Sequence, residues 1–179
     1  MAREARPARL THLDAAGRPR MVDVTAKPAT ARRATAEAQL RVSPETFSLV
    51  AERRAAKGDV LTVAELAGVL AAKRTSELIP LAHPLPLGDV QVEIEPDRSA
   101  SAFRIRATAA TSAQTGVEME ALVAVAIAGL TVYDMVKSVE REAELTGIRL
   151  VEKSGGRSGT WRRAASPRAG SGVRKLPKQ

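Results

Sequence analysis

The chain of 179 residues contains no cysteine and very few aromatic residues. Without cysteine, disulfide bonds and thiolate metal sites are excluded. An aromatic content of 2% is too low for the stacking platforms of single-strand nucleic-acid binders. The two histidines, His12 and His83, lie far apart in the chain, so a multi-histidine metal site within one chain is not expected. The available chemistry is therefore that of lysine, arginine and carboxylate groups.

No long apolar run follows the first arginines, so we expect neither a signal peptide nor a membrane span, and a soluble cytoplasmic protein is the default. The length favours one domain that is large enough for a hydrophobic core. We expect a flexible N-terminal extension over 1–10, a single domain over 11–161 and a disordered basic tail over 162–179.

The net charge of +8 is confined to the two ends of the sequence. Residues 11–161 contain 19 basic and 19 acidic residues, whereas 162–179 contain six basic residues and no acid. The ends are expected to attract polyanions only weakly. A specific nucleic-acid partner is therefore not predicted.

Alternating apolar and polar residues predict several strands. They cover 21–27 (a short edge strand), 34–42, 90–95, 103–109 and 147–151. The segments 90–95 and 103–109 flank a Pro-Asp turn and form a predicted hairpin. Between these strands the pattern is helical, so the order predicts an α+β fold with helices over a mainly antiparallel sheet.

Two helices are predicted between the first strand and the hairpin. Ser43 and Pro44 provide an N-cap and a first helical residue for a helix that runs to about Ala56. Thr62 and Glu65 have the spacing of a capping box, which predicts a second helix over 63–75.

A third, longer helix is predicted over 115–137, and it organises the chain. Residues 121–132 are apolar on every face apart from Thr131, which indicates burial on more than one side. The run is too short for a membrane span. Glu120 and Asp134 are 14 positions apart, so they lie about 21 Å apart along one helix face. They cannot share one small-molecule site within a chain, and a second subunit is the simplest source of the missing groups.

The run Lys153–Gly159 (KSGGRSG) is the sharpest local signal. Its three glycines let backbone N–H groups approach a ligand, while Lys153 and Arg157 add positive charge, which suits phosphate. The alternative is a flexible loop that leads into the basic tail. The spacing of a Walker loop is absent.

Other polar groups also have structural interpretations. Lys57 follows a predicted helix and Lys73 lies in the last turn of another, where a solvated lysine is the favoured interpretation, more strongly so for Lys73. His83 lies in an apolar loop fixed by prolines, and a lone histidine there is more often structural. Asp134 and Lys137 could form an acid–base pair or a simple helix ion pair. Together, these groups suit proton transfer on a phosphorylated small molecule.

Six runs carry a resemblance to a known family. They are LTHLDAAGRPRMVDVTAK (10–27), KGDV (57–60), AAKRTSELIPLAHPL (71–85), TGVEMEAL (115–122), TVYDMVK (131–137) and KSGGRSG (153–159). In this order, over about residues 9–161, they closely resemble the MoaC family of cyclic pyranopterin monophosphate synthases of molybdenum cofactor biosynthesis. The resemblance implies a ferredoxin-like subunit with the long helix at a dimer interface, and a homohexamer built from three dimers.

The resemblance also implies a reaction and a set of site residues. The substrate would be (8S)-3′,8-cyclo-7,8-dihydroguanosine 5′-triphosphate, converted to cyclic pyranopterin monophosphate with release of pyrophosphate. Asp134 matches the family's active-site aspartate, Lys137 stands beside it, and Lys57 matches the catalytic lysine. Expected substrate-binding residues are Leu81, Ala82, His83, Glu118, Met119, Glu120, Lys73, Lys153 and Arg157. No resident metal or cofactor is expected, although Mg²⁺ accompanying the triphosphate is chemically reasonable.

Three positions depart from the family pattern: Ala82 and Val136 stand where relatives often have cysteine, and Arg157 replaces a lysine, which keeps the charge but changes the geometry. Two other interpretations remain. A nucleotide- or RNA-binding module on a ferredoxin-like fold predicts exposed aromatics and a basic sheet face. A homologue retained as a regulatory partner would keep the motifs without the activity.

Overall fold

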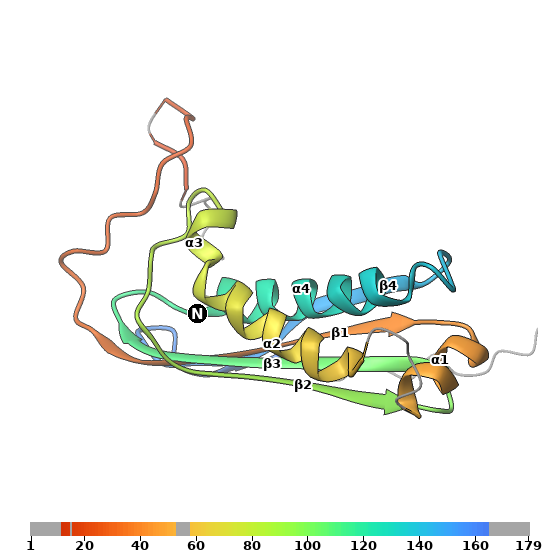
Figure 1. Ribbon diagram of the computed structural model, residues 1–179. Helices are drawn as coiled ribbons and strands as arrows, with labels where there is room; N and C mark the ends of the chain where they lie inside the picture. Colours follow the sequence, from red (N-terminus) through yellow and green to blue (C-terminus); the bar gives the residue numbers. More distant parts are fainter. Residues whose placement is uncertain (1–11, 15, 53–57, 165–179) are drawn as a thin grey trace, which may run out of the picture.

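The computed structural model describes residues 12–14, 16–52 and 58–164. Its elements follow the order strand, helices, two strands, helix and two strands (Figure 1). They are β1 (Thr30–Arg41), α1 (Pro44–Ala51), α2 (Val60–Lys73), α3 (Thr75–Leu78), β2 (Leu87–Asp97), β3 (Ala102–Ala113), α4 (Glu118–Val136), β4 (Glu144–Ser154) and β5 (Trp161–Arg162). The strands form one antiparallel sheet in the order β2-β3-β1-β4-β5. The predicted α+β class is confirmed.

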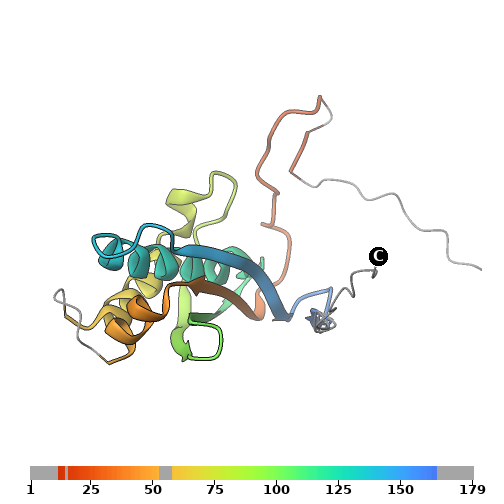
Figure 2. The ribbon, with the colours of Figure 1, turned by 90° about the vertical axis from the view of Figure 1, so that its right-hand side faces the viewer.

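Helices α2 and α4 cover one face of the sheet (Figures 1 and 2). On that face β1 presents alanines and Leu40, all buried, as the alternation over 34–42 predicted. Small residues also line α4, where Ala121, Ala124 and Ala128 have no exposed surface. A Cβ added at Gly129 would lie 2.5 Å from Leu145. The core of this aromatic-poor chain is therefore built by close approach of helix and sheet rather than by large side chains.

Helix α1 begins as predicted, because the Ser43 side chain accepts a hydrogen bond from the N–H of Thr46 and Pro44 follows. It ends at Ala51, and residues 53–57, which include the predicted end and Lys57, lie outside the described residues.

The predicted capping box of α2 is wrong. Asp59 is the N-cap and accepts from the N–H of Thr62 at 3.2 Å, so the helix begins at Val60. Glu65 instead accepts the Ile94 N–H of β2 at 3.0 Å. The carboxylate therefore satisfies a backbone donor of the sheet, which the local sequence could not reveal.

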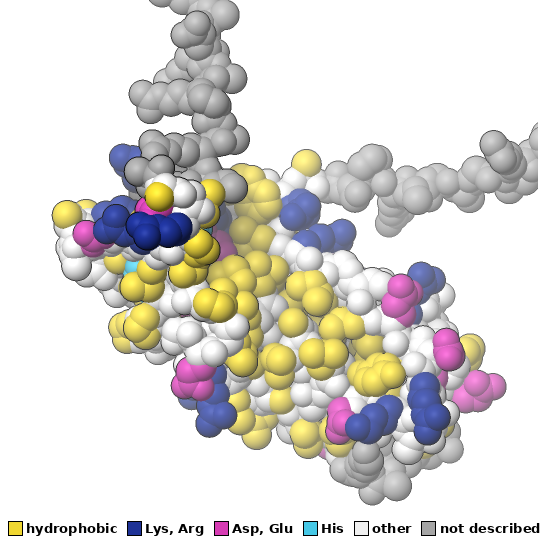
Figure 3. Space-filling model, turned by 90° about the horizontal axis from the view of Figure 1, so that it is seen from above, with side chains coloured by type: hydrophobic (Ala, Val, Ile, Leu, Met, Phe, Trp, Pro, Cys, Tyr) yellow, Lys and Arg dark blue, Asp and Glu magenta, His cyan; other side chains and the backbone are white. Residues whose placement is uncertain are grey.

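Helix α4 packs against β1, β3 and β4 and against α2. By length and composition it could cross a membrane, but half of its apolar window is buried inside this chain, as in the core helix of a soluble protein. The structure thus confirms burial within the subunit. Seen from the helix side, apolar side chains gather over α2 and α4 (Figure 3). We name Val63, Leu66, Leu70 and Leu130, each about half exposed, the helix-face patch.

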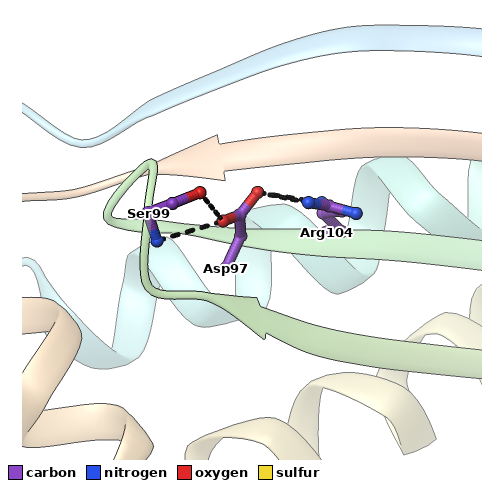
Figure 4. A network of polar contacts seen from close by, with 3 residues as sticks. All are labelled: Asp97, Ser99 and Arg104. Atoms are coloured by element: carbon purple, nitrogen blue, oxygen red, sulfur yellow. Dashed lines mark hydrogen bonds and ion pairs between the residues drawn. The ribbon is translucent and has the colours of Figure 1, made fainter.

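The hairpin of β2 and β3 is closed by a polar network (Figure 4). The Asp97 carboxylate accepts the Ser99 hydroxyl at 2.6 Å and the Nε of Arg104 at 3.0 Å. The Ser99 hydroxyl and Arg104 lower the pKa of Asp97 to about 2. The charged carboxylate therefore fixes this turn at neutral pH.

The predicted edge strand over 21–27 is wrong. This segment forms a turn in which Lys27 N–H donates to the Val24 carbonyl at 2.9 Å, and the Asp23 carboxylate accepts the N–H of Thr25. The competing signal was the aspartate, whose side chain bonds to its own following backbone.

Candidate active site

The start of α4 and the end of β4 meet through one ion pair. Lys153 Nζ donates to Glu118 Oε1 at 2.8 Å, and each side chain is about one-third exposed. The two residues are 35 positions apart, yet β4 and the loop before α4 bring them together. Two predicted site residues are thus direct neighbours.

The glycine-rich loop leaves β4 directly after Lys153 and Ser154. Gly155 and Gly156 have φ values of 97° and 68°, which only glycine adopts readily. A Cβ at Gly155 would lie 2.0 Å from the Ala31 carbonyl oxygen, and one at Gly156 would lie 1.7 Å from Arg32 Nη1. Gly155 is therefore required by close packing on the backbone of β1 as well as by its backbone conformation, whereas Gly156 is required mainly by its backbone conformation, because the Arg32 side chain could move.

Arg32 is a cationic residue of this region that the sequence interpretation missed. Its Nε donates to the Ala113 carbonyl at 3.3 Å and its Nη2 to the Gln114 carbonyl at 3.2 Å. It lies on β1, beside the glycine loop and the loop before α4. No spacing signal could have found it, because its neighbours come from the strand register.

A cavity of about 780 Å³ opens between the glycine loop, the start of β1 and the loop before α4. One carboxylate, Glu118, and several cations line it. The cations are Lys27, Arg32, Arg33, Lys153 and Arg157. Such an excess of positive charge around a concave surface is suited to an anion with several phosphates.

A second cavity of about 470 Å³ shares Thr115, Gly116 and Glu118 with the first, so the two adjoin. Its other walls are mainly apolar and contain most of the residues that were matched to substrate binding. These are Leu81, Ala82, His83, Met119 and Glu120. The structure thus gathers them around one hollow, although they come from separate segments of the chain.

Glu120 is the buried acid of the second cavity, with 4% of its surface exposed. Burial raises its pKa, and the nearby charge of Glu118 acts in the same direction. Both carboxylates line this cavity, and both belong to the first turn of α4. A buried carboxyl group of this kind can exchange a proton or bind the N–H edge of a ligand.

His83 also lines the second cavity, and one of its ring nitrogens is already engaged. Nε2 lies 2.8 Å from the Val22 carbonyl oxygen. A carbonyl only accepts, so Nε2 carries the hydrogen, and a neutral ring presents Nδ1 as an acceptor. The bond orients the imidazole, which agrees with the structural alternative and leaves the functional one open.

The other end of α4 holds a different pair. Lys137 Nζ lies 2.5 Å from Asp134 Oδ1, and their side chains are 54% and 63% exposed. The bond to Asp134 and the negative charge of that carboxylate raise the pKa of Lys137. The turn after the helix is fixed, because Tyr133 Oη donates to the Arg141 carbonyl at 3.2 Å and Glu140 accepts from the N–H and hydroxyl of Ser43.

Residues 21–156 match the protein-family model described as "MoaC family". The chain belongs to the MoaC family. Similar proteins include the cyclic pyranopterin monophosphate synthase of Thermomicrobium roseum, 58% identical over 156 residues that cover 87% of this chain and 94% of the relative. The proteins of the same name from Brucella ovis and Cereibacter sphaeroides are both 55% identical, and they cover 86% and 87% of this chain and 93% and 98% of the relatives.

The MoaC match contains every predicted site residue except Arg157, which immediately follows it. Lys73 is the exposed last residue of α2, which runs toward the end of the molecule where α4 begins (Figure 1). Lys57 lies outside the described residues. Within the described ranges, no group of three histidine or acidic residues could hold a metal ion.

The two groups of predicted site residues remain separate within one chain. The cavities lie at the start of α4, whereas Asp134 and Lys137 lie at its end, about 21 Å away by the rise of an ideal helix. Neither Asp134 nor Lys137 lines a described cavity.

Proposed function

We propose that the chain is a lyase that converts (8S)-3′,8-cyclo-7,8-dihydroguanosine 5′-triphosphate into cyclic pyranopterin monophosphate and pyrophosphate, in molybdenum cofactor biosynthesis. The observation that carries the proposal is the pair of adjoining cavities at the start of α4. One is rich in cations and the other is apolar with a buried acid. This division suits a ligand with a triphosphate at one end and a purine-derived ring at the other. The names of the relatives support the same reaction.

In this proposal Lys153 and Arg157 hold phosphates, with Arg32 beside them, and the buried Glu120 binds the guanine-derived edge. Lys73 offsets further charge as pyrophosphate leaves, and His83 does so when Nδ1 is also protonated, since Nε2–H donates to the Val22 carbonyl. Glu118 positions Lys153 through their ion pair. Leu81, Ala82 and Met119 form the walls against which the ring packs. A magnesium ion, where one takes part, would be bound chiefly by the substrate's own phosphates.

Proton transfer is assigned to Asp134, Lys137 and Lys57. Opening the five-membered ring, building a pyrazine ring and closing a cyclic phosphate move protons repeatedly, and these steps need positioned acids and bases. In the isolated chain the bond to Asp134 raises the pKa of Lys137, so the ammonium group is a weaker proton donor than an ordinary lysine. Burial by another subunit would oppose that shift and bring the lysine closer to the range in which it can donate or accept a proton.

The separation of the two halves supports an assembly in which one subunit's cavities face another's Asp134 and Lys137. We propose a homohexamer of three dimers in the cytoplasm, with α4 at the dimer interface. The helix-face patch supports this, because such an apolar surface is normally covered. The sheet order supports the ferredoxin-like form of the subunit. Light scattering would then give six times the chain mass of 19.0 kDa.

The test is to incubate the full-length protein with the cyclised triphosphate and to measure pterin and pyrophosphate together. We expect the two products in equal amounts, and none from GTP that has not been cyclised. Absence of turnover by a folded, hexameric protein would contradict the proposal and favour a homologue that has become a regulatory partner.

A nucleic-acid-binding module has less support. The face of the sheet opposite the helices has a cavity lined by three glutamates and three arginines, without an aromatic side chain. They are Glu37, Glu93, Glu95, Arg104, Arg106 and Arg149. Such a face has no excess positive charge for a phosphate backbone. Salt-dependent RNA binding that persists without 162–179 would revive this alternative.

A further inference from the structure

The glycine-rich loop is the turn of a hairpin whose second strand lies beyond the family match. Strand β5 comprises Trp161 and Arg162, whereas the match ends at residue 156. In the register of the hairpin, Lys153 is directly opposite Trp161, and Glu152 is opposite Arg162. Lys153, which lines the cationic cavity, is therefore paired with Trp161 of β5.

Arg163 fastens this second strand to β4. Its N–H donates to the Val151 carbonyl at 2.8 Å, and its Nε donates to the Leu150 carbonyl at 2.7 Å. Its guanidinium carbon lies 5.8 Å from the centre of the Trp161 ring, within the range of a cation–π contact. We name Trp161–Arg163 the β5 strap. The strap consists of Trp161, the last residue of the predicted domain, and the first two residues of the tail that was predicted to be disordered.

The other side of the loop is fixed by β1, where Gly155 and Gly156 pack against the Ala31 carbonyl and the Arg32 guanidinium. The loop is therefore held between β1 and the strap, with Lys153 at its start and Arg157 at its tip. Glycine-rich segments lose much conformational entropy when they become ordered. A loop that is already fixed before the ligand arrives loses less on binding.

We propose that Trp161 and Arg163 are positioning residues that hold Lys153 and Arg157 in the geometry that binds the phosphates of the substrate. They touch neither the phosphates nor the reacting atoms. The assignment rests on the proposed function for the identity of the phosphates, but not for the binding of an anion as such.

The experiment compares full-length variants by two measurements. Calorimetry gives the affinity for inorganic tripolyphosphate, and steady-state kinetics give KM and kcat for the cyclised triphosphate. Trp161→Ala and Arg163→Ala are each expected to weaken tripolyphosphate binding and raise KM by about tenfold, with kcat changed by less than about threefold, because binding geometry rather than proton transfer is lost. Trp161→Phe keeps an aromatic ring opposite Lys153 and should restore affinity to within about threefold of wild type.

Arg162→Ala is the matched control. Arg162 lies in the same strand, but its guanidinium donates to Glu152 at 3.1 Å, whereas the guanidinium over the Trp161 ring is that of Arg163. Its removal is expected to change either measurement by less than about twofold, as for an exposed ion pair. Circular dichroism checks that all variants fold.

Unchanged tripolyphosphate affinity in both alanine variants, or no tripolyphosphate binding by wild type, would overturn the strap assignment. If the wild type turns over the cyclised triphosphate but the alanine variants bind tripolyphosphate as tightly as wild type, only the role of the β5 strap is contradicted. Weakened anion binding without any turnover by wild type would contradict the proposed reaction and leave the strap standing. If Arg162→Ala lost as much tripolyphosphate affinity as the other two alanine variants, the effect would reflect general damage to the hairpin. That result would also overturn the assignment.

Discussion

At the start of α4, Glu120 is 4% exposed and lines one of two adjoining cavities, whereas at the end of the same helix Asp134 is 63% exposed and lines no described cavity. One end has the form of a binding site, and the other has a lysine–aspartate pair outside the cavities. In the proposed assembly the two ends of the helix would complete the sites of different copies. The long apolar middle of α4 would then set the distance between the half-sites.

The largest effect is expected at the exposed end. Asp134→Asn removes the carboxylate that accepts from Lys137 and should lower kcat by about 10²–10⁴-fold, the range for loss of a general acid or base. Substrate affinity should change little, since the cavities lie at the other end. Product formation and tripolyphosphate binding are measured side by side. Near-normal turnover by the folded variant would refute the assignment of this end to catalysis.

Mixing two inactive variants tests whether the ends belong to one site. Lys153→Ala, on β4, alters the cavity at the start of α4, and Asp134→Asn alters the ion pair at the end of the helix. If each site combines the two ends from different subunits, random re-pairing leaves about a quarter of the sites intact. Turnover of the mixture should therefore recover to about a quarter of the wild-type rate.

Two Asp134→Asn preparations mixed with each other provide the control, and they should stay inactive. If activity does not recover although mass spectrometry verifies subunit exchange, both ends of the site lie within one chain. That result would contradict the proposal that the two ends of α4 serve different sites.

A smaller effect is expected at the buried end. Glu120→Gln keeps the shape of the side chain but removes the charge and the proton-exchanging group. We expect kcat/KM to fall by about 10–100-fold, mainly through KM, as for a hydrogen bond to a charged group. Glu95→Gln, the same substitution at an exposed carboxylate on the opposite face of the sheet, is the control and should stay near wild type. A loss confined to kcat would contradict the binding role of Glu120 and indicate a role in proton transfer.

The sequence predicted the parts of the fold that follow from periodicity. Strand β1 and helix α4 have strong patterns of period two and of apolar residues, and both are present. The start of α2 was misplaced because Asp59 and Thr62 are both good N-cap residues. The capping box at Thr62 would need the Glu65 side chain, but this carboxylate accepts the Ile94 N–H of β2 instead.

The sequence predicted those site residues that belong to recognisable motifs. Lys153 and Glu118 were both named, but their ion pair follows from the meeting of β4 and α4. Arg32 has no motif of its own, and its position against Gly156 emerges only from strand register. Long-range pairing is what a single sequence does not encode locally.

The smallest expected effect is on stability, and it has opposite signs at the two ends. Glu140, in the turn after α4, has a lowered pKa: its partial burial opposes the shift, but bonds from Ser43 and Thr46 outweigh it. Its stabilisation is present above the unfolded pKa of about 4.3 and is lost as the pH falls through the lower folded pKa. Glu120 has a raised pKa, so its ionisation opposes folding above its folded pKa and costs nothing at acid pH.

At pH 7, Glu140→Gln should therefore lower the free energy of unfolding and Glu120→Gln should raise it, each by on the order of 1 kcal/mol. Urea titration measures both, and both differences should shrink toward pH 3. Glu95→Gln, on the opposite face of the sheet, is the control and should change little. If the two variants shifted in the same direction, Glu120 would be stabilised as a charged group, and the distinction between a buried acid at one end and bonded carboxylates at the other would fail.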